Sequence, residues 1–265
     1  MKTITFTTDF GINSNYPAQM KAVVLSIAPD AMPIDITHSI SKHNIMEGAF
    51  VLQTTVPYFP EGTLHLCIVD PGVGSIRRGI IIVTKTQILV GPDNGLLTPV
   101  AKKLAPFQVY EIKNPNFMLK KISNTFQGRD VFAPVAAHIL NGVLFEEIGP
   151  IIHDYIDLNL EQTEITDKYI AGKILYIDDF GNIITNIQKY LLQKYLEPGK
   201  KVIVFIGKTR KEIPFVNTYS DVKKGAFLIT NSSSDYLEIS ANQSKASDML
   251  KVKLREEIKI EFGHF

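Results

Sequence analysis

The sequence predicts two domains, an α/β domain at the N-terminus and a smaller all-β domain at the C-terminus. Over the first ~150 residues, strand signals alternate with helix signals, which is typical of a mostly parallel sheet flanked by helices. After Pro150 the pattern changes to short alternating apolar runs separated by Gly, Asn, Ser and Asp. That pattern favours a small antiparallel sheet or barrel. The polar stretch 162–168 marks the boundary, so we expect domains over 1–160 and 169–265.

Local patterns predict the elements of the first domain. Apolar runs that end at Asp, Pro or Gly predict strands, and Pro17 opens a helix that carries Met20 and Val24 on one face. The expected strands lie at 4–8, 32–36, 64–69, 80–83 and 88–90, the last two as a hairpin. The expected helices lie at 17–27, 44–56, 97–104 and 131–140.

In the second domain, each short apolar run predicts one strand of the antiparallel sheet or barrel. The expected strands are 174–177, 183–187, 202–206, 227–230, 237–239, 250–254 and 258–262.

Composition excludes several classes of function. A net charge of +1 in 265 residues, with no large Lys/Arg cluster, argues against nucleic acid as a partner. No apolar run approaches the roughly 18 residues of a membrane span, and the N-terminus becomes polar too early for a signal peptide. Cys67 is the single cysteine, so an internal disulfide is excluded and a cytoplasmic location is expected. With scattered histidines and one cysteine, we expect no metal site.

Two predicted strands of the first domain end on an acid, Asp9 and Asp70. Parallel strands bring their carboxyl ends to one edge of a sheet, where α/β folds bind ligands. A carboxylate such as Asp9 can accept hydrogen bonds from both hydroxyls of a vicinal diol. Asp70, with Arg77 beyond the following turn, can orient and polarise a water molecule. The alternatives are an Asx-turn at Asp9 and a solvated acidic turn at Asp70.

Two further stretches carry candidate binding residues. In 178–182, Asp178 can hold an ammonium group and Asn182 can pair with a purine edge, although a simple turn is the competing interpretation. In 125–130, Gly128 permits close backbone approach to a ligand, and Asp130 is expected to cap the following helix. His138 lies within that helix and is expected to be packed or on the surface.

Six phrases in a fixed order resemble the S-adenosylmethionine hydrolase family. These enzymes are adenosine-forming hydroxide adenosyltransferases that share their fold with fluorinase and chlorinase. The phrases are TTDFG at 7–11, IVDPGVG at 68–74, TFQGRDVFAP at 125–134, DDFGNIITNI at 178–187, PFVNTYSDV at 214–222 and NSSSDYLEISANQ at 231–243. The resemblance covers essentially the whole chain.

The resemblance implies that S-adenosylmethionine is the substrate and that adenosine and methionine are the products of attack at C5′. It makes Asp9 the residue that grips the ribose hydroxyls, Asp178 the partner of the methionine ammonium, and Asn182 the adenine-reading amide. It places Ser233 and Ser234 at the methionine end and Phe126 and Tyr219 around the nucleoside. It also implies a homotrimer with sites between subunits and no cofactor besides the substrate.

The catalytic set of the family is Asp, Arg and His around the attacking water. Asp70 and Arg77 match the first two, whereas Gln127 stands where the family has histidine. Glutamine can position water but cannot exchange a proton near neutral pH. A protein that binds S-adenosylmethionine or adenosine without turnover is therefore an alternative. A halogenase is disfavoured, because a carboxylate at Asp70 would repel a halide.

Overall fold

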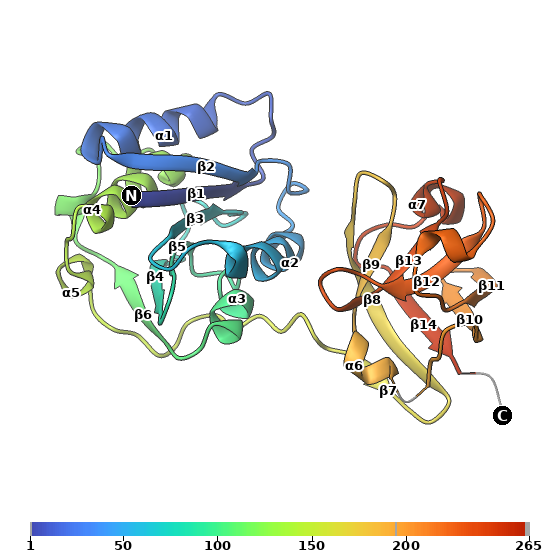
Figure 1. The fold of residues 1–265 in the computed structure, drawn as a ribbon. Coiled ribbons are helices and arrows are strands. Elements are labelled where there is room, and N and C mark those ends of the chain that lie inside the picture. The colour runs from blue at the N-terminus through green and yellow to red at the C-terminus, as the bar shows by residue number, and fades with distance from the viewer. Residues whose placement is uncertain (1, 194, 263–265) are drawn as a thin grey trace. The chain divides into compact units, whose positions relative to one another are not determined.

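The computed structural model describes residues 2–193 and 195–262. They form two compact units, unit 1 and unit 2, which divide between Leu158 and Asn159 (Figure 1). The predicted combination of an α/β fold and an all-β, barrel-like fold is confirmed. No helix in the described residues is long and apolar enough to cross a membrane.

Unit 1 is built on a six-stranded sheet in the order β2-β1-β3-β5-β4-β6. The pairs β1–β2, β1–β3 and β3–β5 are parallel, and β4 runs antiparallel to both β5 and β6. The sheet is therefore mixed, with the parallel part at β2, β1, β3 and β5. Its strands are β1 (Lys2–Thr8), β2 (Ala31–Thr37), β3 (Leu64–Ile68), β4 (Gly79–Thr84), β5 (Ile88–Pro92) and β6 (Phe107–Ile112).

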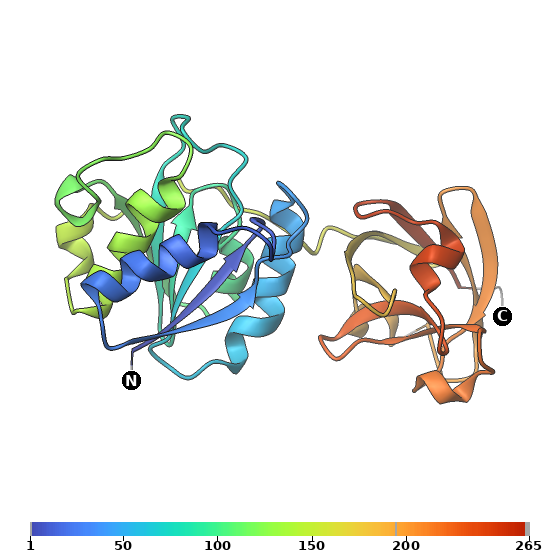
Figure 2. The same cartoon turned by 90° about the horizontal axis from the view of Figure 1, so that it is seen from above.

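Helices cover both faces of this sheet. Helix α1 packs against α4 and α2 packs against α3, and Figure 2 shows α1 and α4 on one side of the strands and α2 on the other. The helices are α1 (Tyr16–Ile27), α2 (Ile45–Thr55), α3 (Thr98–Lys103), α4 (Ala133–Leu140) and α5 (Phe145–Ile148). Short turns are η1 (Val56–Tyr58), η2 (Pro115–Phe117) and the π-helical η3 (Gly128–Phe132).

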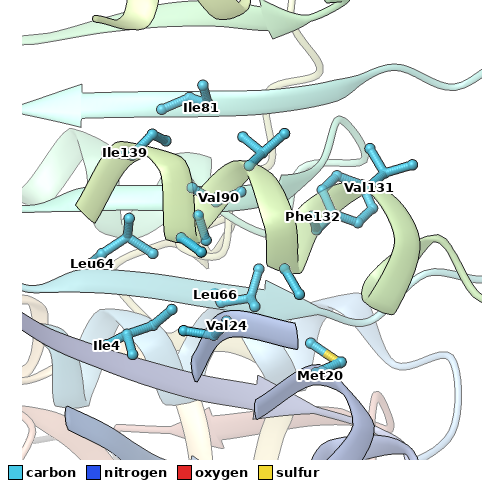
Figure 3. Packing of buried hydrophobic residues seen from close by; sticks show 14 of the residues in the cluster. Ile4, Met20, Val24, Leu64, Leu66, Ile81, Val90, Val131, Phe132 and Ile139 are labelled. Carbon is cyan, nitrogen blue, oxygen red and sulfur yellow. The ribbon is translucent and has the colours of Figure 1, made fainter. Parts of the chain in front are cut away.

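The main core of unit 1 lies between the sheet and the α1–α4 layer. Figure 3 shows Ile4, Leu64 and Leu66 of the sheet near Val24 of α1 and the side chains of α4. Ile4, Val24, Leu64 and Leu66 are fully buried. This apolar layer fixes β1 and β3 side by side, and their carboxyl ends carry Asp9 and Asp70.

Unit 2 is an eight-stranded antiparallel sheet in the order β11-β10-β14-β8-β9-β13-β12, with β7 paired to β8. A bridge between Phe215 and Ile229 links the segment after β11 to β12, so the sheet nearly closes on itself. Its strands are β7 (Glu164–Ile165), β8 (Tyr169–Ile177), β9 (Ile183–Gln188), β10 (Lys201–Ile206), β11 (Thr209–Pro214), β12 (Phe227–Asn231), β13 (Tyr236–Ala241) and β14 (Glu257–Glu261). Its helical segments are α6 (Lys189–Leu192), η4 (Tyr219–Asp221) and α7 (Ala246–Leu250).

The strand predicted at 250–254 is wrong. Helix α7 ends at Leu250, and Lys251 takes a left-handed conformation with φ of 54°. Leu250, Val252 and Leu254 do alternate as the sequence suggests, and they pack against the core of unit 2. The alternation therefore reflects burial of a turn-rich segment, because its backbone joins no strand of the described sheet.

Candidate active site

The carboxyl edge of the parallel strands in unit 1 holds a cavity of about 200 Å³. Thr8 at the end of β1 pairs in register with Ile68 at the end of β3, so the residues that follow both strands lie at one edge. The structure brings five predicted residues to this cavity, namely Asp9, Asp70, Phe126, Gln127 and Gly128. Arg77 joins them through its ion pair with Asp70.

Asp70 and Arg77 form a bidentate ion pair whose side chains are largely enclosed. The Arg77 Nε lies 3.0 and 2.9 Å from the two carboxylate oxygens, and Nη2 lies 2.5 Å from Oδ2. The two side chains are only 5% and 12% exposed, and the Phe132 ring centroid is 5.1 Å from the guanidinium carbon. The solvated-turn interpretation of Asp70 is therefore wrong, because the pair is enclosed and geometrically fixed.

Gln127 belongs to the same hydrogen-bonded group. Its Oε1 accepts a hydrogen bond from Arg77 Nη2 at 2.5 Å. Because the amide oxygen is engaged by a cation, the amide nitrogen is the end that can donate to a ligand in the cavity that Gln127 lines. Gln127 thus offers a donor where a histidine would offer a titratable ring.

Asp9 faces the segment that follows β2. Its Oδ2 accepts a hydrogen bond from the backbone N–H of His43 at 2.8 Å, and Lys42 Nζ donates to its backbone oxygen. Asp9 is buried but lines the cavity. The Asx-turn interpretation is wrong in that the carboxylate binds this other loop, and its remaining acceptor capacity faces the cavity.

Aromatic rings form one wall of the cavity. Phe126 lies 5.8 Å from Phe10 and 4.6 Å from Tyr16, measured between ring centroids, and the guanidinium carbon of Arg129 lies 5.0 Å from the Phe126 ring centroid. The sequence analysis missed Phe10, Tyr16, Lys42 and His43. Phe10 could have been found, because it directly follows Asp9 within TTDFG.

Asp130 does not cap a helix as predicted. The helix α4 begins at Ala133, after the π-helical turn η3, and Asp130 instead binds Arg129 Nε at 2.6 Å and the Ser123 N–H at 2.8 Å. Burial alone would raise the pKa of Asp130, but these two partners hold that pKa below its usual value. Asp130 therefore anchors the loop that presents Phe126 and Gln127.

Unit 2 contains a larger cavity of about 870 Å³. Predicted residues Asp178, Asn182, Tyr219 and Ser233 line it. Ser234 lies in the same turn between β12 and β13, where its N–H donates to Ser232, but it is not one of the residues described as lining the cavity.

The β8–β9 turn is closed by the two residues predicted to bind substrate. Asp178 accepts hydrogen bonds from both the backbone and the side-chain amide of Asn182, each at 2.8 Å. The turn interpretation is therefore correct for these residues. Because the Asn182 amide nitrogen donates to Asp178, the Asn182 amide oxygen is oriented away from that carboxylate. Phe180 at the tip of this turn is 78% exposed.

Tyr219 binds a residue that the sequence analysis did not single out. Its hydroxyl donates to Glu238 Oε1 at 2.7 Å. Burial and the Glu238 carboxylate raise the pKa of Tyr219, so the phenol stays protonated. Glu238 was missed because it lies within the apolar strand LEIS, where alternation alone gives no functional signal.

The histidines do not form a metal centre in the residues that the structure describes, and no cluster of His, Cys, Asp and Glu there is arranged to hold a metal ion. His38 contacts Thr8 and Asp35 instead. His138 packs its ring against Phe117, and burial lowers its pKa.

Comparison with known proteins identifies the family. Residues 4–149 match the SAM hydroxide adenosyltransferase N-terminal domain, and residues 172–259 match the corresponding C-terminal domain. The chain is 40% identical to an (R)-S-adenosyl-L-methionine hydrolase of Methanocaldococcus jannaschii, covering 97% of this chain and 95% of that protein. It is 27% identical to a fluorinase of Nocardia brasiliensis, with 98% and 97% covered.

A solved structure agrees with these matches. An uncharacterized conserved protein from Thermotoga maritima superposes with a TM-score of 0.91 at 37% identity, covering 97% of this chain and 99% of that one. The resemblance seen in the six sequence phrases is therefore confirmed over nearly the whole chain. Since both domain matches and the relatives extend over nearly all its residues, this chain belongs to the SAM hydroxide adenosyltransferase family.

Proposed function

We propose that this chain hydrolyses S-adenosylmethionine to adenosine and methionine by attack of water on the C5′ carbon. The observation that carries the proposal is the hydrogen-bonded Asp70–Arg77–Gln127 group, whose Asp70 and Gln127 line the same cavity as Asp9. Membership of the family supports the substrate, and the relatives named as hydrolases support the reaction.

The reaction needs little acid catalysis, because the sulfonium is already a good leaving group. Attack forms the C5′–O bond and breaks the C5′–S bond, methionine leaves as a neutral thioether, and one proton of the water is released. The enzyme must supply an aligned, activated water and keep bulk solvent out.

Each residue of the group in unit 1 takes one part of this task. Asp70 accepts a hydrogen bond from the attacking water, and Arg77 stabilises the negative charge that develops on its oxygen. The amide nitrogen of Gln127 donates to the same oxygen, since its Oε1 is held by Arg77. Asp9 accepts hydrogen bonds from the ribose hydroxyls, and Phe126 and Gly128 pack against the nucleoside.

The second domain, 169–265, supplies the other substrate contacts in this proposal, and the first, 1–160, supplies the ribose and water contacts. Asp178 binds the methionine ammonium, Asn182 reads adenine and Tyr219 packs against the nucleoside. Ser233 and Ser234 contact the methionine end.

A homotrimer with sites between subunits is part of the proposal. Exposed apolar side chains support it, because Ile76 lies near Arg77 in sequence and Phe180 lines the cavity of unit 2, and both are exposed. Light scattering after gel filtration tests the trimer. A cytoplasmic location is also proposed, supported by the single cysteine, Cys67, which is buried.

Incubation of the purified chain with S-adenosylmethionine in halide-free buffer tests the reaction. Chromatography should show adenosine and methionine in equal amounts, and addition of chloride should produce no 5′-chloro-5′-deoxyadenosine. Formation of a chlorinated nucleoside would show that the chain is a halogenase and would reject the proposed hydrolysis.

Gln127 keeps a second candidate function open, which is binding of S-adenosylmethionine without turnover. The observation that favours it is that Arg77 donates to the amide of Gln127, a group that cannot exchange a proton near neutral pH as a histidine can. Tight calorimetric binding of intact S-adenosylmethionine, with no adenosine after hours, would support this function and reject hydrolysis.

A further inference from the structure

Glu238 is a buried carboxylate in the wall of the unit 2 cavity. It lies on β13, opposite Thr230 of β12 and Ile184 of β9, and is 5% exposed. Together with Asp178 and Tyr219 it lines the cavity of about 870 Å³. A charged group is expensive to bury, so its place in the wall of a ligand-sized cavity needs a physical reason.

Both hydrogen bonds to this carboxylate end on the same oxygen. Tyr219 Oη lies 2.7 Å and Ser240 Oγ lies 2.6 Å from Oε1. Neither bond reaches Oε2, and within residues 2–193 and 195–262 no Lys, Arg or His forms an ion pair with Glu238. The carboxylate therefore retains unused acceptor capacity and an uncompensated charge.

A second carboxylate, Asp178, lines the same cavity as Glu238. The Tyr219 hydroxyl donates to Glu238, and, besides burial, the charges of Glu238 and Asp178 both raise the pKa of Tyr219. Asp179 also lines the cavity, and Lys245 is the lysine among the described lining residues. This part of the wall is therefore anionic and suits a cationic ligand group.

We propose that Glu238, through Oε2, binds the ammonium group of the amino-acid half of the substrate together with Asp178. The inference rests on the proposed function and deepens it by naming a binding residue, Glu238, to which the sequence analysis gave no role. A neutral amine such as that of adenine would donate a hydrogen bond but leave the buried charge uncompensated. An ammonium group donates a hydrogen bond and also compensates the charge.

Calorimetry with the two products tests the assignment on the full-length chain. Methionine carries the ammonium without adenine, and adenosine carries adenine without the ammonium. Glu238→Gln should weaken methionine binding by about tenfold or more, the usual effect of losing a hydrogen bond to a charged group. Adenosine binding should remain within about twofold. Glu212→Gln, an exposed carboxylate on β11 paired with Lys201, is the matched control and should change neither affinity.

A second ligand makes the test independent of the variant's folding. Wild-type chain should bind 4-(methylthio)butanoic acid, which is methionine without the amine, at least tenfold more weakly than methionine. Equal affinities for the two ligands would overturn the proposal. So would a Glu238→Gln chain that is folded, as judged by circular dichroism, and that loses affinity for adenosine but keeps its affinity for methionine. If wild-type chain binds neither product, the proposed function itself fails; if it binds both and Glu238→Gln changes neither, only this inference fails.

Discussion

Replacing Asp70 by asparagine removes the charge on which the proposed activation of water depends, while keeping the shape of the side chain. In the wild-type chain Arg77 makes three contacts within 3.0 Å to the two carboxylate oxygens. The side chain of asparagine has one oxygen in place of two, so its NH₂ group would face the Arg77 guanidinium where one carboxylate oxygen now accepts. Arg77 would keep its bond to Gln127, which holds it near its present position.

The expected loss has a catalytic part and a structural part. Removal of a positioned base lowers kcat by roughly 10²–10⁴-fold. Breaking a fully buried ion pair lowers the free energy of unfolding by about 3–5 kcal/mol, and this is the upper limit for a pair whose side chains are 5% and 12% exposed. Since Asp9 and the unit 2 residues are unchanged, the affinity for S-adenosylmethionine should fall much less than kcat.

Initial rates of adenosine formation at saturating S-adenosylmethionine give kcat, calorimetry gives the affinity, and urea unfolding gives the stability. Asp157→Asn is the matched control, because Asp157 is half exposed and pairs with Lys102 on the surface. It should change the free energy of unfolding by less than about 1 kcal/mol. A folded Asp70→Asn chain that forms adenosine at the wild-type rate would refute the assigned role.

Three further predictions concern other parts of the chain. Gln127→His should leave kcat similar or raise it, since an imidazole can exchange a proton near neutral pH, and steady-state kinetics would expose a large loss as evidence for a specific role of glutamine. Burial lowers the pKa of His65 to about 4, so unfolding exposes a group that takes up a proton below about pH 6.5. The contribution of neutral His65 to stability is complete above that pH and is lost as the pH falls toward 4. Between pH 7.5 and pH 5, the free energy of urea unfolding should decrease by about 2 kcal/mol more in wild type than in His65→Gln. Equal decreases in the two chains would contradict this prediction. Gly181→Ala should cost roughly 1–3 kcal/mol by urea unfolding, because φ is 80° and a Cβ would lie 2.6 Å from Lys245 Cβ. Gly142→Ala, with φ of 90° and open space around it, is the control and should cost less.

Local sequence signals were sufficient where one pattern has one structural outcome. The acids after β1 and β3 were predicted to lie at one sheet edge because the apolar runs before Asp9 and Asp70 indicated strands of a mostly parallel sheet. The structure pairs these two strands directly. The β4–β5 hairpin also followed from its two apolar runs. Strand β6 was missed although Phe107, Val109 and Ile112 mark it, and β11 was missed because its sequence TRKEIP is mostly polar.

Contacts between distant segments could not be predicted. Nothing local indicates that Gln127 accepts a hydrogen bond from Arg77, 50 positions away. In the same way, Glu238 acquires its meaning only when folding brings Tyr219 to it from the turn η4. Asp130 failed as a predicted cap because the π-helical turn η3 shifts the start of α4 to Ala133. The sequence motifs thus identified most of the candidate site residues, whereas the hydrogen-bond partners of those residues depend on tertiary packing.

Isotope labelling tests the central claim most directly, because the claim is that water attacks C5′ and methionine departs. The wild-type chain would be incubated with S-adenosylmethionine in H₂¹⁸O without halide, and both products would be examined by mass spectrometry. We predict one ¹⁸O atom in adenosine, on its 5′ oxygen, and none in methionine beyond exchange measured in a control without enzyme. Unlabelled adenosine, or S-adenosylmethionine that is bound but remains intact, would contradict the account.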